Sequence, residues 1–277
     1  MNISLNLDLE KPTLGGLLTL LVEANMVMGK ESTQDLNLHV FGNNLDLNWL
    51  NRMQDQILDN YAHTVNIILK QPPNLCYPFD RYTKNGFSYY NTERIQDLYS
   101  KLKIKPILLW REGLQQSVFQ KSKTFSPKII TIHLKRVFPF DVNESNAQAE
   151  VWAKALRYFL DFSTELDVIL VGNDPTPTEI ELGPRIRRAD DIGLNLGEQM
   201  NLIQNSVGFI GTASGICSGA VFSEVPYFIY KSPEHHKEQF ATELKNEEIF
   251  SFSALNQKII RKIPETKTLF ENMRSFL

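Results

Sequence analysis

Short apolar runs alternate with longer segments of helical spacing along this chain, and that alternation restricts its fold more than any other feature. Strands separated by helices form parallel sheets that helices cover on both faces. The runs IITIH at 129–133 and DVILVG at 167–172 are apolar almost throughout. Such runs suit strands that are buried on both sides. The sequence therefore predicts an α/β protein.

The alternation occurs twice, interrupted by a polar stretch at 111–127 that we interpret as a linker. In the first half we expect strands at 2–7, 36–42, 63–70 and 105–110, and helices at 13–28, 46–59 and 92–102. In the second half we expect strands at 128–134, 167–173, 207–212 and 225–231, helices at 146–162, 196–205 and 214–224, and a helical end over 235–277. These patterns predict two Rossmann-like parallel-sheet domains facing a cleft, residues 1–125 and 126–277.

Composition narrows the class of function. The 277 residues are 42% hydrophobic and 22% charged, which is sufficient for buried cores. A net charge of −3 argues against a nucleic-acid-binding protein, which needs a basic surface. Cys76 and Cys217 are far apart in apolar settings and predict no disulfide framework. With no signal peptide and no apolar run of about 20 residues, we expect a cytoplasmic protein without a transmembrane segment.

The stretch GTASGICSG at 211–219 lies where one expected strand ends and a helix begins. Free N–H groups at a helix start attract anions, and glycine lets a ligand approach the backbone. Ser214 is placed either to cap the helix or to donate to a phosphate oxygen. A tight turn with an ordinary cap explains the same residues, so both interpretations stay open. The candidate binding residues here are Thr212, Ser214, Gly215 and Ser218.

Two other loops end strands of the second half. His133, Lys135 and Arg136 follow the strand at 128–134, where cations can neutralise a leaving diphosphate. Gly172 and Asn173 form the turn after the next strand. A solvated strand end is the alternative for each. RIRR at 185–188 is interpreted as a solvated charge run.

The first expected helix opens on Gly15 and Gly16, which permit a ligand to approach the backbone. A flexible entry to an apolar helix explains them as well. Asp8 and Glu10 lie in the same loop as candidate polar groups. No metal site is predicted, because the adjacent histidines at 235 and 236 have no Cys or Asp at ligand spacing and no His-Glu-x-x-His motif occurs. The sequence also lacks a Walker lysine loop for phosphate binding.

Several of these stretches resemble the bacterial lipopolysaccharide heptosyltransferases. TLGGLLTLLVEA at 13–24 is similar to the opening of that family, and FIGTASGICSGAVFSEVP at 209–226 is similar to its late Gly-Thr-Asp-Ser-Gly stretch. LGEQMNLIQNS at 196–206 and ITIHLKR at 130–136 fit the family's second domain. The resemblance implies a metal-independent GT-B-fold glycosyltransferase. It also implies a nucleotide-sugar co-substrate bound mainly by the second domain, and no separate cofactor.

The chain departs from the family at three polar positions. The family's Asp after the first glycine falls at Gly16, and the Asp and His of the late motif fall at Ala213 and Ser218. The resemblance therefore predicts a divergent transferase with another catalytic base, for which Asp8 and Glu10 are the candidates. HLKR at 133–136 is also similar to a basic stretch of fucosyltransferases of the same fold, which marks Arg136 as a diphosphate contact.

The expected partners are a nucleotide-sugar donor and a glycan or lipid-linked acceptor, with no nucleic acid. A lipid-linked acceptor is compatible with peripheral association at a membrane. Two alternatives stay open, since one fold hosts many activities. The first is a noncatalytic nucleotide- or sugar-binding protein of this fold. The second is another enzyme on it, such as a sugar epimerase or a pyruvyl transferase.

Overall fold

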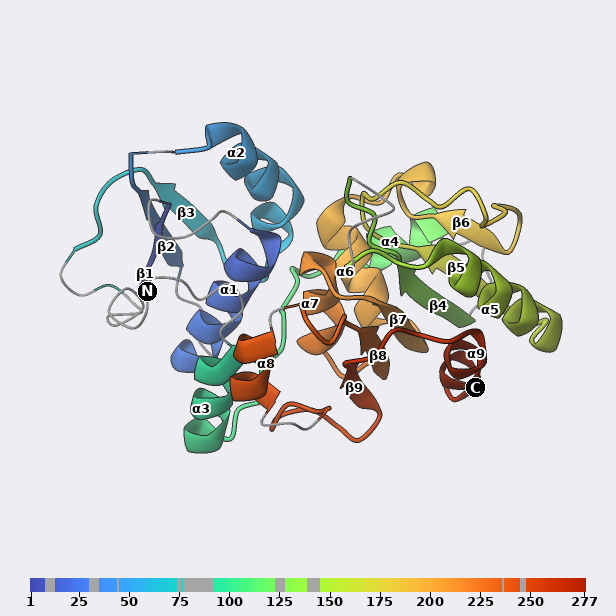
Figure 1. Cartoon of the computed structure of the whole chain (residues 1–277). Helices are drawn as coiled ribbons and strands as arrows, with labels where there is room; N and C mark the ends of the chain where they lie inside the picture. The colour runs from blue at the N-terminus through green and yellow to red at the C-terminus, as the bar shows by residue number, and fades with distance from the viewer. Residues whose placement is uncertain are drawn as a thin grey trace. The chain divides into compact units, whose positions relative to one another are not determined.

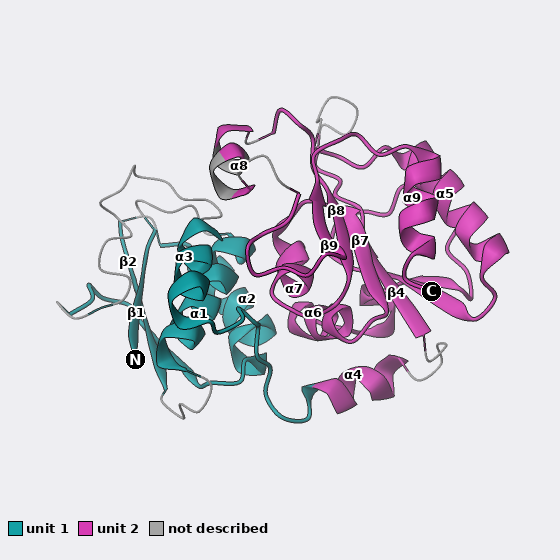
Figure 2. Cartoon of the chain, turned by 90° about the horizontal axis from the view of Figure 1, so that it is seen from below, with its two compact units in different colours: residues 1–114 teal, residues 115–277 magenta. Residues whose placement is uncertain are grey.

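A computed structural model describes residues 1–7, 13–29, 35–43, 45–73, 76, 92–122, 128–138, 145–235, 237–244 and 248–277. The chain forms two compact units, residues 1–114 and 115–277 (Figures 1 and 2). The division between the units falls at 114, whereas the pattern of the sequence predicts a domain boundary at 125. None of the described helices is long and apolar enough to cross a membrane.

The first unit contains a three-stranded parallel sheet in the order β1-β2-β3. Its strands are β1 (Asn2–Asn6), β2 (Leu36–Phe41) and β3 (Val65–Ile68). Its helices are α1 (Leu14–Met28), α2 (Leu47–Gln56), the short η1 (Leu58–Asn60) and α3 (Thr92–Leu102). Helix α1 is buried over most of its length because its residues are almost all apolar.

Of two predictions for residues 105–127, the strand is wrong, and the linker holds only in that the division between the units lies within 111–127. The expected strand at 105–110 joins no sheet, and only Trp110 forms an isolated antiparallel bridge, to Tyr61. Pro106 has no N–H to give to a ladder, which disfavours a strand there. The polar stretch expected as a linker contains a helix, α4 (Leu114–Ser122). Leu114 and Val118 lie one turn apart on that helix and are both buried, so an apolar stripe fixes it.

The second unit contains a six-stranded sheet in the order β6-β5-β4-β7-β8-β9, and every neighbouring pair is parallel. The strands are β4 (Lys128–His133), β5 (Leu166–Leu170), β6 (Ile186–Arg188), β7 (Gly208–Thr212), β8 (Tyr227–Tyr230) and β9 (Gln257–Ile260). The strand order reverses between β4 and β7. This is the order of the Rossmann fold, in which ligands bind at the reversal.

Helices cover both faces of this sheet (Figure 2). The helices that follow β4 in the chain are α5 (Ala149–Phe162), η2 (Asp190–Ile192), α6 (Leu196–Gln204), η3 (Gly215–Cys217), α7 (Ser218–Val221), α8 (Lys237–Leu244) and α9 (Thr266–Arg274), of which α5 and α9 cover one face and α6 and α7 the other (Figure 2). Trp152 and Phe159 of α5 pack with Leu269 and Met273 of α9 in one buried core against the strands. On the other helices, a Cβ at Gly219 would lie 3.3 Å from Met200, so α7 packs closely on α6.

Three further expectations for the second unit are corrected. RIRR at 185–188 contains strand β6 rather than a solvated run, and Arg185 donates to the carbonyls of Leu160 and Leu166 at 2.9 and 2.7 Å. The end expected to be wholly helical contains strand β9, whose short sequence QKII is half polar and forms no apolar run. The helix expected at 214–224 is instead the short η3 followed by one turn of α7.

Candidate functional site

The carboxyl ends of β4 and β7 lie side by side, because His133 pairs with Gly211 in the sheet register. This is the point where the strand order reverses, and ligands of such sheets bind in the crevice beyond it. The loops after β4, β5 and β7 meet there and bring together many of the residues that the sequence nominates. We name this place the switch-point site and define it by His133, Lys135, Gly172, Thr212 and Ser214.

His133 lies at the centre of the switch-point site, with 2% of its surface exposed. Its Nδ1 lies 2.9 Å from the carbonyl oxygen of Val171, and its Nε2 lies 2.8 Å from the hydroxyl oxygen of Ser214. Burial lowers the pKa of His133, and this outweighs the Val171 carbonyl and the Asp174 carboxylate, which raise it. The imidazole is therefore neutral near pH 7.

Lys135 follows β4, and its backbone N–H donates to the hydroxyl of Thr212 at 2.7 Å. That bond ties the loop after β4 to the end of β7. The side chain is half-buried, and burial lowers the pKa of its ammonium group while the carboxylate of Asp174 raises it. Lys135 takes part in no salt bridge with the residues that the structure describes. A partly desolvated ammonium at a strand end suits an anionic ligand.

Gly172 brings the loop after β5 against His133. Its φ is +97°, and a Cβ at this position would lie 2.6 Å from Nδ1 of His133. The N–H of Gly172 donates to the side-chain oxygen of Gln199 at 2.7 Å. The side-chain nitrogen of Gln199 donates in turn to the carboxylate of Asp190 and to the carbonyl of Leu194, both at 3.0 Å. The buried Gln199 therefore holds this loop in place. The sequence analysis did not nominate it, because a glutamine inside a helix carries no signal.

The turn after β7 differs from the expected capped helix start. Ser214 occupies the N-cap position of η3 but makes no side-chain capping bond, since its hydroxyl pairs with His133 instead. The capping interpretation of Ser214 is therefore wrong. The N–H groups of Gly215 and Ile216 point to no acceptor within the described ranges. Donors of this kind are available to an anion.

Two buried side chains lie beneath this turn. The thiol of Cys217 donates to the carbonyl of Thr212 at 3.4 Å, and burial raises the pKa of Cys217 to about 11. Cys217 is therefore a protonated packing group near neutral pH. Lys231 follows β8 with 6% of its surface exposed, and its charge acts on Cys217 as the charge of Lys135 does. Ser218 is buried in α7, where its carbonyl accepts the N–H of Phe222.

The other nominated residues are spread more widely. Arg136 is half-buried beside Lys135, and Asn173 is exposed beside Gly172. Gly15 and Gly16 belong to the first turn of α1 in the first unit. Asp8 and Glu10, the candidate bases, lie outside the described residues, as does His236.

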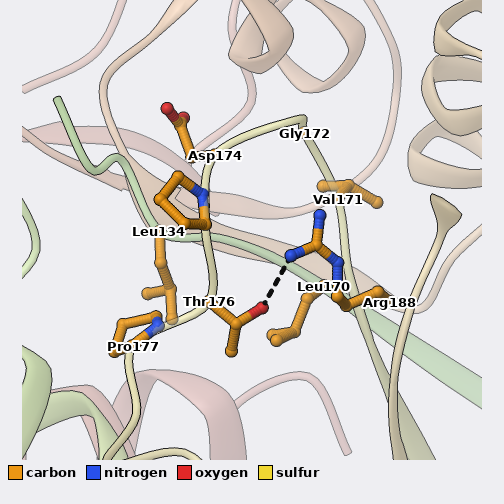
Figure 3. A pocket seen from close by; sticks show the side chains of 9 residues that line it. Leu134, Leu170, Val171, Gly172, Asp174, Thr176, Pro177 and Arg188 are labelled. Atoms are coloured by element: carbon orange, nitrogen blue, oxygen red, sulfur yellow. Dashed lines mark hydrogen bonds between the residues drawn. The ribbon is translucent and has the colours of Figure 1, made fainter. Parts of the chain in front are cut away.

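A small pocket opens beside the switch-point site (Figure 3). It measures about 250 Å³, counted out to its open mouth, and is lined by Leu134, Leu170, Val171, Gly172, Asp174, Pro175, Thr176, Pro177 and Arg188. Arg188 donates to the hydroxyl of Thr176 at 3.3 Å and to the carboxylate of Asp190 at 2.7 Å. The pocket shares Gly172 and Asp174 with the surroundings of His133. No group of three His, Cys, Asp or Glu side chains suited to a metal ion occurs in the described part of the chain.

Comparison with solved structures finds similar folds at low sequence identity. The chain is similar to E. coli ADP-heptose LPS heptosyltransferase II, with a TM-score of 0.60 and 10% identity over 100% of this chain and 98% of that one. It is similar to E. coli heptosyltransferase WaaC with ADP, with a TM-score of 0.58 and 10% identity over the whole of both chains. A family 9 glycosyltransferase from Veillonella parvula gives a TM-score of 0.53 and 11% identity over 99% of this chain and 96% of that one.

No family model and no curated protein matches the sequence. The likeness therefore lies in the three-dimensional arrangement, over almost the full length of each compared chain. The chain has the GT-B fold of these glycosyltransferases and is a divergent example of it. The predicted fold class, with parallel-sheet Rossmann-like halves, is confirmed.

Proposed function

We propose that this protein is a metal-independent glycosyltransferase of the cytoplasm. It moves a sugar from a nucleotide-sugar donor to a glycan or lipid-linked acceptor, working as a soluble or peripheral membrane protein in lipopolysaccharide or polysaccharide assembly. The fold supports this proposal, since its structural neighbours include a heptosyltransferase solved with ADP. Residues 126–277 hold the donor, and residues 1–125 serve the acceptor.

One observation carries the proposal: a cation and several hydrogen-bond donors lie together at the carboxyl ends of β4 and β7, where the strand order reverses. Lys135 contributes an ammonium group without a salt bridge to any described residue, and Ser214 contributes a hydroxyl 2.8 Å from His133. The uncapped start of η3 adds two N–H donors. In a transfer reaction, negative charge builds on the leaving diphosphate, and fixed donors at that position lower the barrier. Arg136 is placed to add a second cation from the same loop.

A thermal-shift panel tests donor binding. UDP, GDP, ADP, dTDP and CMP are each added to the wild type and to Lys135→Met and Arg136→Ala. A ligand at 100 times its Kd adds about 2.7 kcal/mol of stability. For a chain of this size, the melting temperature rises by roughly 2–4 °C for each kcal/mol. We expect one nucleotide to shift the wild type and to shift both variants less. No shift with any nucleotide would contradict the proposal.

A second assay separates transfer from the rival functions. The protein is incubated with the sugar form of the nucleotide that binds, together with membrane glycolipid extract as the acceptor source. Transfer releases the free nucleotide, a nucleoside diphosphate or, from a CMP-sugar, CMP. Epimerisation yields an altered nucleotide sugar, and a noncatalytic binding protein yields neither. Asp8→Asn and Glu10→Gln, made singly and together, test the proposed base. Transfer at the wild-type rate in the double variant would remove both as candidates.

A further inference from the structure

The pair formed by His133 and Ser214 determines where a proton goes when an anion reaches the switch-point site. A carbonyl oxygen can only accept, so Nδ1 of His133, 2.9 Å from the carbonyl of Val171, carries a hydrogen. In the neutral ring, Nε2 is then an acceptor. The hydroxyl of Ser214, 2.8 Å away, must donate to it. In the free protein, the single hydroxyl hydrogen of Ser214 is therefore used by His133.

An anion at Ser214 competes for this hydrogen. If Ser214 donates to a phosphate oxygen, Nε2 of the buried imidazole loses its donor, and an unpaired buried polar atom is unfavourable. A proton added to Nε2 removes that penalty. The protonated Nε2 can donate to the lone pairs of Ser214, and the carboxylate of Asp174 lies 3.5 Å from it.

The charges facing His133 favour such protonation more strongly when an anion is present, because the anion adds negative charge beside the ring. The loop after β4 contributes Lys135, the loop after β5 contributes Asp174, and the turn after β7 contributes the uncharged Ser214. From α6, the neutral amide of Gln199 reaches the loop after β5. Without a ligand, burial and Lys135 lower the pKa of His133. An anion that pairs with Lys135 offsets the cation that lowers the pKa of His133, and its own negative charge acts with the carboxylate of Asp174 to raise that pKa against the effect of burial.

We propose that binding of a diphosphate at the switch-point site is coupled to the uptake of one proton by His133. The proton comes from the solvent and binds to Nε2, while the hydroxyl of Ser214 turns to donate to the phosphate. This inference rests on the proposed function, because it needs the diphosphate to bind at this site. Since the bound state holds one more proton, affinity is highest at low pH and falls as pH rises through the pKa of His133 in the complex. The fall is up to about tenfold per pH unit.

Isothermal titration calorimetry in two buffers with different heats of ionisation counts the protons taken up. The probes are the four nucleoside diphosphates of the thermal-shift panel and inorganic pyrophosphate. At pH 7.5 we expect the wild type to take up more protons than His133→Gln, whose uptake reflects only the titration of the ligand itself. Asp174→Asn should give an intermediate value. His63→Gln, which removes a histidine from the first unit, is the matched control and should behave as the wild type.

Each outcome separates the two proposals. Binding with equal proton uptake in the wild type and His133→Gln would overturn this inference and leave the proposed function standing. If neither the nucleotides nor pyrophosphate bind, both fail. Nitrogen-15 NMR of the wild type gives a test that needs no folded His133 variant. The ring of His133 should change from the neutral, Nδ1-protonated form to the doubly protonated form as ligand is added, and a ring that stays neutral in the complex would contradict the inference.

Discussion

Two turns of this chain look alike in sequence and differ in structure. TLGG at 13–16 and TASG at 212–215 each place a hydroxyl residue, Thr13 or Ser214, at the N-cap position of a helix, with glycine in the turn that follows. In the first, the hydroxyl of Thr13 accepts the N–H of Gly16 at 3.1 Å and caps α1. In the second, the hydroxyl of Ser214 pairs with His133 on a neighbouring strand, and the helix start is left uncapped.

The difference shows that small residues at a helix start do not by themselves mark a ligand site. What separates the two turns is the partner of the hydroxyl group. A capping hydroxyl satisfies the N–H groups that an anion would use, whereas a hydroxyl held by another strand leaves them available. We infer that the turn at 13–16 is structural and that the turn at 212–215 binds the ligand.

The largest expected effect concerns Lys135, the cation whose backbone N–H bonds to Thr212 of the second turn. Lys135→Met should weaken binding of the selected nucleotide by about 10- to 100-fold, because a hydrogen bond to a charged group contributes roughly 1.5–3 kcal/mol. Lys128→Met is the matched control. Lys128 begins the same strand, is largely exposed and forms a 4.0 Å ion pair with Glu165. Calorimetric dissociation constants for the two variants decide the comparison, and equal constants would place the anion elsewhere.

The next effect concerns the glycine that lies against His133. Gly172→Ala combines an unfavourable φ of +97° with a new Cβ only 2.6 Å from the imidazole of His133. Gly193→Ala also has an unfavourable φ, +73°, but its new Cβ would have no atom within 4 Å. Backbone strain of this kind costs about 1–3 kcal/mol. We expect Gly193→Ala to show that loss alone and Gly172→Ala to lose roughly a further 1 kcal/mol and to bind nucleotide more weakly. Urea unfolding measures both, and equal losses would show that the ring moves aside freely.

A smaller effect tests the first turn. Thr13→Ala removes the cap of α1 and should lower the free energy of unfolding by about 1 kcal/mol. The same substitution should leave nucleotide affinity unchanged, since the capping bond belongs to the helix alone. Chemical denaturation and calorimetry on one preparation give both values. A drop in affinity with no loss of stability would reverse the roles that we give to the two turns.

The smallest effect concerns the attachment of α4 to the second unit. Glu198 accepts from Lys121 at 2.7 Å, from Ser117 at 3.0 Å and from the N–H of Asn195 at 2.9 Å. These bonds lower the pKa of Glu198 even though burial raises it. Its stabilisation is therefore present above the ordinary carboxyl pKa and is lost as pH falls through the lowered value. Glu198→Gln should flatten the stability profile below about pH 5, as measured by urea unfolding at several pH values, and an unchanged profile would exclude this carboxyl.

The sequence predicted most helices and strands because their apolar period is long enough to read. Helices α1, α3 and α5 were expected close to where they lie. Strands β6 (IRR) and β9 (QKII) were missed because each is short and at least half polar, so neither forms an apolar run. The apolar run at 105–110 was wrongly predicted to be a strand, because it forms no hydrogen-bonded ladder with a neighbouring strand.

For the candidate site, the sequence nominated His133, Lys135 and Ser214 separately, from their positions after expected strands. It could not show that the first and third share a hydrogen bond, because that depends on β4 and β7 being neighbours. Gln199 was missed for the same kind of reason. Its importance comes from the N–H of Gly172, which is 27 residues away in the chain. Contacts of this length depend on strand order, which local patterns do not encode.

The central claim is that the anion binds at the turn after β7 and not at the turn before α1. Amide hydrogen exchange, followed by mass spectrometry with and without saturating nucleotide, tests it most directly. We predict slower exchange in peptides that cover 133–136 and 212–217, with unchanged exchange over 13–19. Protection over 13–19 with none over 212–217 would contradict the account.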